Sequence, residues 1–382
     1  MRRIRIFEPL KIIPKIPRLL IQRQMDFEFE KIPYTAEHIP VKKIVNFFLA
    51  GLNQYILPSR PLGRPVFAQV EPTNICNLSC PLCLTVAQVG GRAPSYLDYH
   101  AYKKFIDEVG DNLLLLILWN WGEPFLHPDI FRMISDAKAY GIIVVSSTNG
   151  NVGFENEEKA KLLVQSGLDS LIVAVDGETQ ATYSEYRKGG DLSRVIEGIR
   201  TIIRVRNQLG SKTPIINMRF VAMRHNEHEM NDVQKIAKDL GVDYFTVKTV
   251  FIPPESDNKL DPVYAPVSRD LRWYDYYGPD YERKEKFFEC MRPWKRITLD
   301  SGGRIIPCEF DFIGKYPFGV LGYDKNAIAS WKSPFSSGFR KGFKRGHNDY
   351  YLCEKCVYKN SFATECTIRR VRILESPDKK ND

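Results

Sequence analysis

The sequence is informative first through what it lacks. Its longest strongly apolar run, residues 113–119, is far shorter than the roughly 20 residues that a membrane-spanning helix needs. The motifs of serine hydrolases (GxSxG), zinc proteases (HExxH) and P-loop nucleotidases are missing. The six histidines do not stand at metal-ligand spacings from the cysteines. These absences argue against those enzyme classes and leave the cysteines as the residues that carry chemistry.

The eight cysteines are unevenly distributed, because more than two hundred residues between Cys83 and Cys290 contain none. A secreted disulfide scaffold would spread its cysteines more evenly over a short chain, so this clustering favours metal ligation in a reducing compartment. Near the N-terminus, Lys11, Pro14 and Lys15 interrupt the apolar residues, so the apolar core of a signal peptide does not form. We therefore expect a cytoplasmic protein.

Positive charge is concentrated near the N-terminus. The formal net charge is +9, and residues 1–24, with seven basic residues and one acid, contribute +6 of it. Within an N-terminal extension over residues 1–64, apolar residues from Ile44 to Ile56 recur at helical spacing. We expect this helix to cover the main domain, because apolar stripes usually face a core. The alternative is a peripheral contact of residues 1–57 with an anionic membrane surface. No nucleic acid is expected, because the charge is local and lacks interleaved aromatic residues.

Residues 65–250 alternate between short apolar runs and longer amphipathic segments. Strands are predicted at 66–70, 113–119, 142–146, 170–175, 215–222 and 244–250, with helices at 99–109, 128–140, 155–166, 193–209 and 228–240. Six strands alternating with helices indicate an α/β fold with a parallel sheet or a partial barrel. Ligands of such folds bind at the carboxyl ends of the strands, which is where each motif below falls.

A CxxxCxxC loop, formed by Cys76, Cys80 and Cys83, follows the first predicted strand. It offers three thiolates and no fourth, so a four-iron cluster bound there keeps one iron open for an outside ligand. A structural zinc site would need four ligands in a closed arrangement. Inert core cysteines are a poor alternative, because the loop is polar.

Three further motifs follow the next three strands. They are Trp121-Gly122-Glu123-Pro124, then Thr148-Asn149-Gly150, then Asp176-Gly177 with Tyr183, Arg187 and Gly189-Gly190 downstream. Glycine permits close approach of the backbone to a ligand, whereas Asn, Asp and Arg supply directed hydrogen bonds. Each motif is weak alone, but four in this order indicate one site.

Together these motifs resemble those of the radical SAM (S-adenosylmethionine) superfamily. The resemblance implies a partial (βα)6 TIM-like barrel in which Cys76, Cys80 and Cys83 hold a 4Fe-4S cluster that coordinates SAM. The residues that it assigns to SAM binding are Gly122, Glu123, Pro124, Asn149, Asp176 and Arg187. The sequence departs from the family at Trp121, which replaces the first glycine of a GGEP motif. It also has Leu82 where an aromatic residue is frequent and Ala174 where many members have serine.

The second cysteine group lies in residues 286–374 and comprises Cys290, Cys308, Cys353, Cys356 and Cys366. Its C…GxxxxC…CxxC layout resembles the SPASM/twitch extension of radical SAM enzymes, and most closely the twitch form. The resemblance implies one auxiliary 4Fe-4S cluster on Cys290, Cys308, Cys353 and Cys356, because two auxiliary clusters would need roughly seven or eight ligands. Cys366 is then not a ligand, and it is either a small buried hydrophobic residue or a donor of a hydrogen atom to a radical. In a further alternative, Cys366 is a ligand in place of Cys353 or Cys356. Zinc is the alternative for this region taken alone.

The resemblance implies an enzyme that cleaves SAM reductively to a 5′-deoxyadenosyl radical and abstracts a hydrogen atom from its substrate. The auxiliary cluster would oxidise the substrate radical, which makes the enzyme a dehydrogenase-like oxidoreductase. Alternatives are epimerisation or carbon–carbon or thioether cross-linking that uses Cys366, and action on a lipid-linked substrate at the membrane. A flavodoxin or ferredoxin-type electron donor is expected, while small-molecule, peptide and lipid substrates remain open. Residues 251–285 are predicted to be a linker and residues 375–382 a polar tail.

Overall fold

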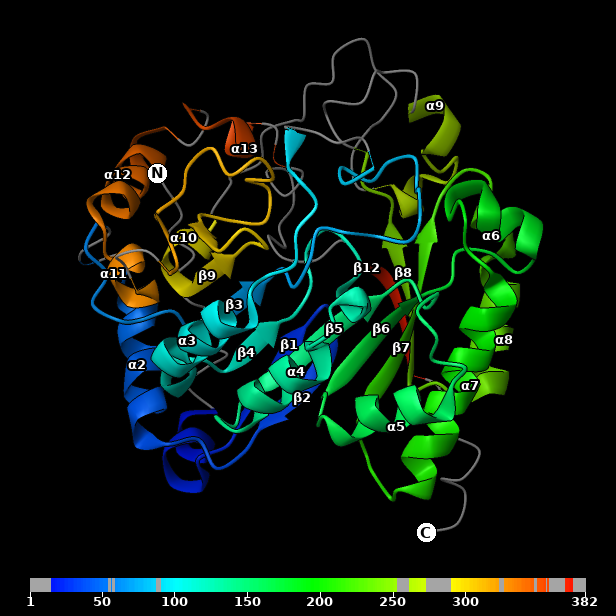
Figure 1. The fold of residues 1–382 in the computed structure, drawn as a ribbon, viewed down its shortest axis with the longest axis horizontal. Coiled ribbons are helices and arrows are strands. Elements are labelled where there is room, and N and C mark those ends of the chain that lie inside the picture. Colours follow the sequence, from blue (N-terminus) through cyan, green and yellow to red (C-terminus); the bar gives the residue numbers. More distant parts are fainter. Residues whose placement is uncertain are drawn as a thin grey trace.

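The computed structural model describes residues 15–53, 56, 59–86, 91–252, 261–272, 290–322, 326–346, 349–354, 356 and 368–373. Helices and strands in these ranges form one curved sheet with helices on its outer face (Figure 1). No helix within these ranges combines the length and apolarity that crossing a bilayer requires.

Six parallel strands form the centre of the sheet, as the α/β pattern predicted. They are β3 (Phe67–Val70), β4 (Leu115–Ile117), β5 (Ile143–Thr148), β6 (Ser170–Ala174), β7 (Ile215–Ala222) and β8 (Tyr244–Thr249). Each pairs in parallel with the next strand along the chain. The strand predicted at 113–119 is shorter than expected, because residues 118–119 already lead into the turn that carries the second motif.

Helices cover the outer face of this sheet. They are α3 (Tyr99–Val109), α4 (Ile130–Lys138), α5 (Glu157–Gln165), α6 (Gln180–Tyr186), α7 (Leu192–Gln208) and α8 (Met230–Leu240). Their apolar faces and alternate strand residues form the main hydrophobic cluster. Side chains of Asp98, Asn156 and Asp191 cap the starts of α3, α5 and α7 by accepting hydrogen bonds from backbone N–H groups. The short helix α6 was not predicted, and Thr179 caps it.

The C-terminal region extends the same sheet at both edges. Beside β3 lie β9 (Arg296–Leu299), β10 (Arg304–Ile306) and β11 (Gly319–Val320), and beside β8 lies β12 (Ile368–Ile373). The strand β9 is parallel to β3 and so satisfies backbone groups that an edge strand would leave unpaired. The helices of this region are α10 (Arg292–Lys295), α11 (Ala327–Trp331), α12 (Pro334–Gly346) and α13 (Tyr351–Glu354). The predicted auxiliary-cluster region is therefore continuous with the barrel.

The described part of the predicted linker contributes to the core. It holds α9 (Asp261–Tyr264) and the short helix η7 (Arg269–Leu271), and the side chains of Tyr264, Ala265 and Leu271 are buried. Tyr264 and Ala265 pack with Leu82, which lies between two cysteines of the first loop. The rest of the linker, the tail at 375–382 and Cys366 lie outside the described residues.

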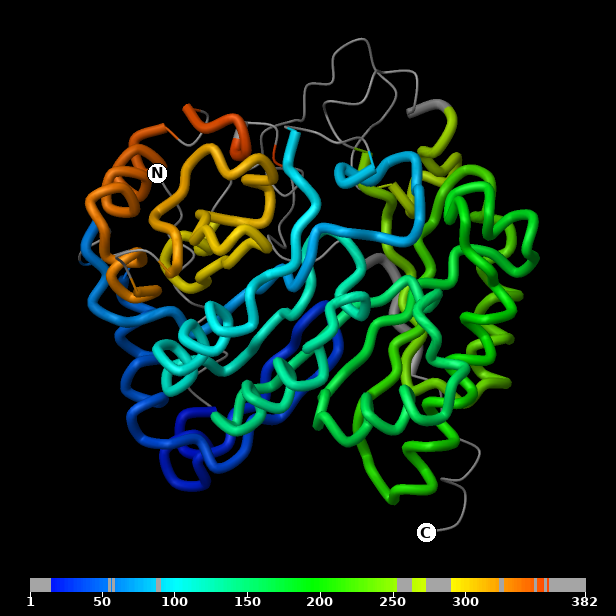
Figure 2. The backbone as a smooth tube through the Cα atoms, viewed as in Figure 1, coloured from blue at the N-terminus to red at the C-terminus, as the bar shows by residue number. Residues whose placement is uncertain are grey.

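The N-terminal extension covers the domain, as expected, through the short helix η2 (Arg18–Gln22) and α2 (Val41–Leu52). The Asn53 side-chain amide, fully buried after α2, donates to the backbone carbonyls of Gly63 and Trp294 and so ties the extension to the C-terminal region. The blue and orange segments of Figure 2 accordingly lie on the same side of the molecule.

A hairpin of the extension, β1 (Met25–Phe29) and β2 (Ile32–Ala36), was not predicted. Its apolar residues pack against the strand side chains that face away from the helices, including Ile117 and Ile172, and so fill the inside of the sheet. Glu30 and Lys31 form its tip with positive φ angles of 50° and 62°. The Glu30 carboxylate lies 2.6 Å from Arg219 Nη2 on β7 and 3.8 Å from Lys248 Nζ on β8. Burial works to raise the pKa of Glu30, but the two cations outweigh it and hold that pKa below its usual value.

Replacing Glu30 tests whether this charge contact holds the hairpin in the sheet. We expect Glu30→Gln to destabilise the iron-loaded protein by about 3 kcal/mol, because Arg219 would stay buried without its carboxylate. Glu28→Gln, on the exposed side of the same strand, is the matched control and should change stability little. Thermal unfolding under anaerobic conditions measures both variants. Equal unfolding temperatures for the two variants would show that apolar packing alone holds the hairpin in the sheet.

Candidate active site

A pocket of about 270 Å³ opens at the carboxyl ends of the strands. Its lining includes Cys76, Cys80 and Cys83 from the loop after β3, Gly122, Glu123 and Pro124 from the turn after β4, Asn149 after β5, and Arg187 after α6. The structure thus brings together all the residues predicted for the first cluster and for SAM except Asp176. Asp176 lies directly behind Arg187, to which it is bonded.

The turn after β4 approaches the cysteine loop closely at Gly122. This residue has φ of 89°, and a Cβ atom there would lie 2.4 Å from the carbonyl oxygen of Thr73. Only glycine fits both constraints. The backbone N–H of Glu123 donates to Ile75 O at 2.8 Å, next to Cys76. The turn is therefore fixed to the loop that bears the thiols.

The Glu123 carboxylate connects two turns of the pocket. It accepts hydrogen bonds from the backbone N–H of Asn149 at 2.7 Å and of Phe125 at 3.2 Å. Burial raises its pKa to about 7, although these hydrogen bonds work in the opposite direction. Its charge state therefore changes near neutral pH, unlike that of an ordinary glutamate.

Asn149 links the third motif to the cysteines. Its side-chain amide donates to Asn77 Oδ1 at 2.9 Å and lies 3.7 Å from Cys76 Sγ. Asp176, fully buried, accepts from Arg187 Nε at 2.6 Å and from the backbone N–H of Val221 at 2.7 Å. These two contacts hold the Arg187 guanidinium at the pocket wall, with Nη1 3.9 Å from Cys80 Sγ.

Cys76 and Cys80 are shielded from water, which disfavours the charged thiolate form unless a positive charge lies nearby. Burial raises the pKa of Cys76 to about 11 and also raises that of Cys80, which Arg187 opposes. No three His, Cys, Asp or Glu side chains in the described ranges stand close enough together to hold a single metal ion. The three cysteines surround a shared pocket, which fits a cluster in which each thiolate binds a different iron.

The floor of the pocket contains functional candidates that sequence reasoning missed. Arg219 and Lys248 project from β7 and β8 into the lining, and Glu30 of the hairpin lies beside both. The available signal was a charged residue inside an otherwise apolar strand. Nothing in the sequence indicated that Glu30, about 190 residues away from Arg219, would join them.

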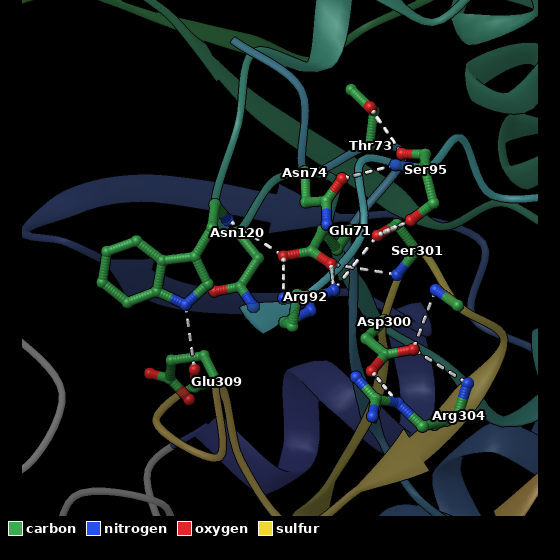
Figure 3. Close-up of polar contacts among 12 residues, drawn as sticks. Glu71, Thr73, Asn74, Arg92, Ser95, Asn120, Asp300, Ser301, Arg304 and Glu309 are labelled. Atoms are coloured by element: carbon green, nitrogen blue, oxygen red, sulfur yellow. Dashed lines mark hydrogen bonds and ion pairs between the residues drawn. The ribbon is translucent and has the colours of Figure 1, made fainter. Parts of the chain in front are cut away.

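Glu71, the first residue after β3, connects four segments at the seam between barrel and C-terminal region (Figure 3). Its fully buried carboxylate pairs with the Arg92 guanidinium and accepts hydrogen bonds from the backbone N–H groups of Ser301 at 3.0 Å and Trp121 at 3.4 Å. Arg92 Nη2 also donates to Ser301 Oγ at 3.1 Å. Because Glu71 and Arg92 flank the cysteine loop on either side, this contact fixes the loop against both the Trp121 turn and the β9–β10 turn.

Trp121, the departure from the GGEP pattern, makes a second connection across this seam. Its indole N–H donates to the carbonyl oxygen of Glu309 at 3.1 Å, and its ring meets Phe312 edge-on with centroids 5.5 Å apart. Glu309 directly follows Cys308. One side chain of the pocket wall therefore contacts the residue that follows Cys308.

The second cysteine group also carries a buried arginine. Arg292 Nη1 lies 3.9 Å from Cys308 Sγ and 3.1 Å from Glu309 Oε1. Burial raises the pKa of Cys290 to about 11, with Arg292 opposing and Cys356 adding to the rise. Cys308 and Cys353 belong to the main hydrophobic cluster, and among the described residues neither they nor Cys290 and Cys356 form a disulfide bond. A buried cation beside a thiol offsets part of the cost of the negative charge that a thiolate-bound cluster would bring.

Comparison with known families agrees with this geometry. The profile of the radical SAM superfamily matches residues 70–232, and that of SPASM, an iron–sulfur cluster-binding domain, matches residues 290–357. The chain belongs to the radical SAM superfamily. A radical SAM protein uses a 4Fe-4S cluster and SAM, and its SPASM region implies auxiliary iron–sulfur chemistry.

Relatives of this radical SAM chain include proteins of varied activity. It is 26% identical over 341 residues to mycofactocin maturase MftC of Mycobacterium ulcerans, covering 83% of this chain and 88% of that one. It is 25% identical over 274 residues to the tungsten-containing aldehyde ferredoxin oxidoreductase cofactor-modifying protein of Pyrococcus furiosus, covering 68% and 75%. Streptococcus suis SuiB, solved with its precursor peptide SuiA, shares the fold at 15% identity, with a TM-score of 0.56 over 87% of this chain and 79% of SuiB.

The Glu123 contact predicts a pH effect on SAM binding. The ionised Glu123 carboxylate accepts hydrogen bonds from two backbone N–H groups, whereas a protonated carboxyl accepts well through one oxygen only. Protonation therefore weakens the contact that holds two turns of the pocket together. Because the pKa of Glu123 is about 7, SAM affinity should fall as the pH drops through that value. Glu123→Gln mimics the protonated form. At pH 8 we expect it to bind SAM about tenfold more weakly than the unchanged protein, with no further loss at pH 6.

Equilibrium binding of SAM to anaerobic, iron-loaded protein measures this effect. Glu158→Gln, on the outside of α5, is the control and should keep the original pH profile. If the Glu123→Gln variant bound SAM with the same affinity and pH profile as the unchanged protein, the predicted role of Glu123 in SAM binding would be wrong.

Proposed function

We propose that this protein oxidises its substrate by radical chemistry. Cys76, Cys80 and Cys83 would hold the first 4Fe-4S cluster, which would supply the electron that splits SAM into methionine and a 5′-deoxyadenosyl radical. This radical would take a hydrogen atom from the substrate and become 5′-deoxyadenosine. Cys290, Cys308, Cys353 and Cys356 would hold a single auxiliary 4Fe-4S cluster, which would accept the electron that the substrate radical loses together with a proton. A flavodoxin or ferredoxin-type protein supplies the first electron.

The observation that carries this proposal is the position of Trp121. It lines the SAM pocket and hydrogen-bonds to the residue next to Cys308, so the pocket and the second thiol group share a wall. A substrate in the pocket would lie near both clusters, which suits electron transfer from the substrate radical to the auxiliary cluster.

Residues of the pocket have distinct tasks in this proposal. Gly122, Glu123 and Pro124 would place the methionine part of SAM through backbone groups, while Asn149 and Arg187, held by Asp176, would orient its polar groups. Arg219 and Lys248 would face the substrate. Both line the pocket that holds the three cysteines, and the Glu30 carboxylate lies beside both.

Peptides and small molecules are the substrate classes that the comparisons support. SuiB was solved with a precursor peptide, and relatives from Gluconobacter oxydans and Bradyrhizobium diazoefficiens are named PqqA peptide cyclase. Epimerisation or cross-linking through Cys366 stays a prediction, because Cys366 lies outside the described residues.

Iron content and SAM cleavage test the proposal together. Anaerobically reconstituted protein should contain about eight iron atoms per chain, four in each of two clusters. It should release 5′-deoxyadenosine when supplied with SAM and a reductant. Cys76→Ala should keep about four iron atoms and form no 5′-deoxyadenosine, because the cluster that contacts SAM is lost. Bound zinc without 5′-deoxyadenosine would overturn the proposal.

Two variants of the second group make a matched pair. Cys356→Ala should lower the iron content to about four atoms while SAM cleavage continues, because only the auxiliary cluster loses a ligand. Cys366→Ala should keep about eight atoms. The reverse pattern would make Cys366 a ligand in place of Cys356.

A further inference from the structure

The outward face of α2 carries an apolar stripe. Val41, Val45, Leu49 and Leu52 are all exposed, Val45 at 52% and Leu49 at 38%. Their spacing of three or four residues places them along one side of the helix. The opposite side, with Ile44 and Ala50, is the one that packs on the domain. The exposed stripe therefore lies on a different face of α2 from the one that packs on the domain.

The short helix η2, which packs in the same hydrophobic cluster as α2, also exposes apolar side chains. Leu19 packs in the same cluster as Ile44 of α2, while its neighbours Leu20 and Ile21 point outward, Ile21 with 81% exposure. Ile56, just beyond α2, is exposed as well. Of the 17 large apolar side chains exposed in the described part of the chain, nine lie between residues 20 and 62. Such clustering marks an interaction surface, because single exposed apolar residues are normally scattered.

The net charge of the N-terminal segment indicates which kind of partner this surface binds. Residues 1–64 contain twelve Lys and Arg against five Asp and Glu, which accounts for +7 of the net charge of +9. Arg18 and Lys42 are paired with Asp26 and Asp111, and Lys43 is buried, so the surplus comes from the other basic residues of the segment. Two copies of this chain joined through the stripe would bring two such positive segments together, which disfavours self-association.

We propose that the apolar surface of α2 and η2 docks on a lipid bilayer that contains anionic headgroups. The twelve residues of α2 span about 18 Å, much less than the 30 Å or so of a hydrocarbon core, so the helix lies in the plane of the interface. Its apolar stripe enters the boundary between headgroups and acyl chains, and the net positive charge of the segment favours a surface of anionic lipid phosphates. The protein is thereby a peripheral membrane protein, whatever reaction it catalyses.

Vesicle sedimentation with the full, iron-loaded chain tests this docking. Vesicles of phosphatidylcholine mixed with phosphatidylglycerol should bind the protein, and pure phosphatidylcholine should bind it more weakly. The double variant Val45→Glu/Leu49→Glu should reduce binding to mixed vesicles roughly tenfold or more, because two carboxylates would enter the apolar boundary. Raised salt should weaken the binding of the unchanged protein.

The control is Leu162→Glu/Leu209→Glu, which changes two apolar residues of similar exposure, 47% and 44%, far from α2. It should bind mixed vesicles like the unchanged protein. Unchanged iron content in both double variants confirms that they are folded. Binding that Val45→Glu/Leu49→Glu leaves intact would overturn the proposal. So would failure of the unchanged protein to bind, or a dimer in the absence of lipid that this variant converts to a monomer.

Discussion

The buried ion pair between Glu71 and Arg92 is the constraint on which the site depends. These residues lie on either side of the loop that bears Cys76, Cys80 and Cys83, and the Glu71 carboxylate also holds the backbone of Trp121 and Ser301. Loss of either partner would leave an unpaired charge in the interior, which is strongly unfavourable. The pair therefore fixes the thiol loop, the turn of Trp121 and the C-terminal region relative to one another.

The two groups of cysteines share one electrostatic arrangement, in which an arginine lies near a sulfur and an acid lies beside the arginine. Each has an arginine about 4 Å from one sulfur, the half-buried Arg187 beside Cys80 and the buried Arg292 beside Cys308, and each arginine is held by an acid. The acid fixes the guanidinium, and the guanidinium offsets the cost of negative charge on the sulfurs. Trp121 lies between the two groups, where most members of the family have a small glycine. Its indole makes the pocket wall and the auxiliary region a single unit.

The sequence predicted the elements whose pattern is local. All six central strands and five of the covering helices are present, because apolar periodicity and caps are determined by neighbouring residues. The packing of the β1–β2 hairpin inside the sheet, the pairing of β9 with β3 and the pairing of β12 with β8 were not predicted, because each joins segments far apart in the chain. The motifs, which are local in the sequence, indicated most of the pocket lining, whereas the contributions of Arg219, Lys248 and Glu71 became visible only in the fold.

The central claim is that three cysteines hold a cluster with one open iron and that a second, fully ligated cluster lies across the Trp121 wall. Mössbauer spectroscopy of protein reconstituted with iron-57 tests it most directly, with and without SAM. The account predicts that SAM changes the signal of one iron in about eight, since only one iron lacks a thiolate. A spectrum in which SAM alters no iron, or alters irons of both clusters, would contradict it.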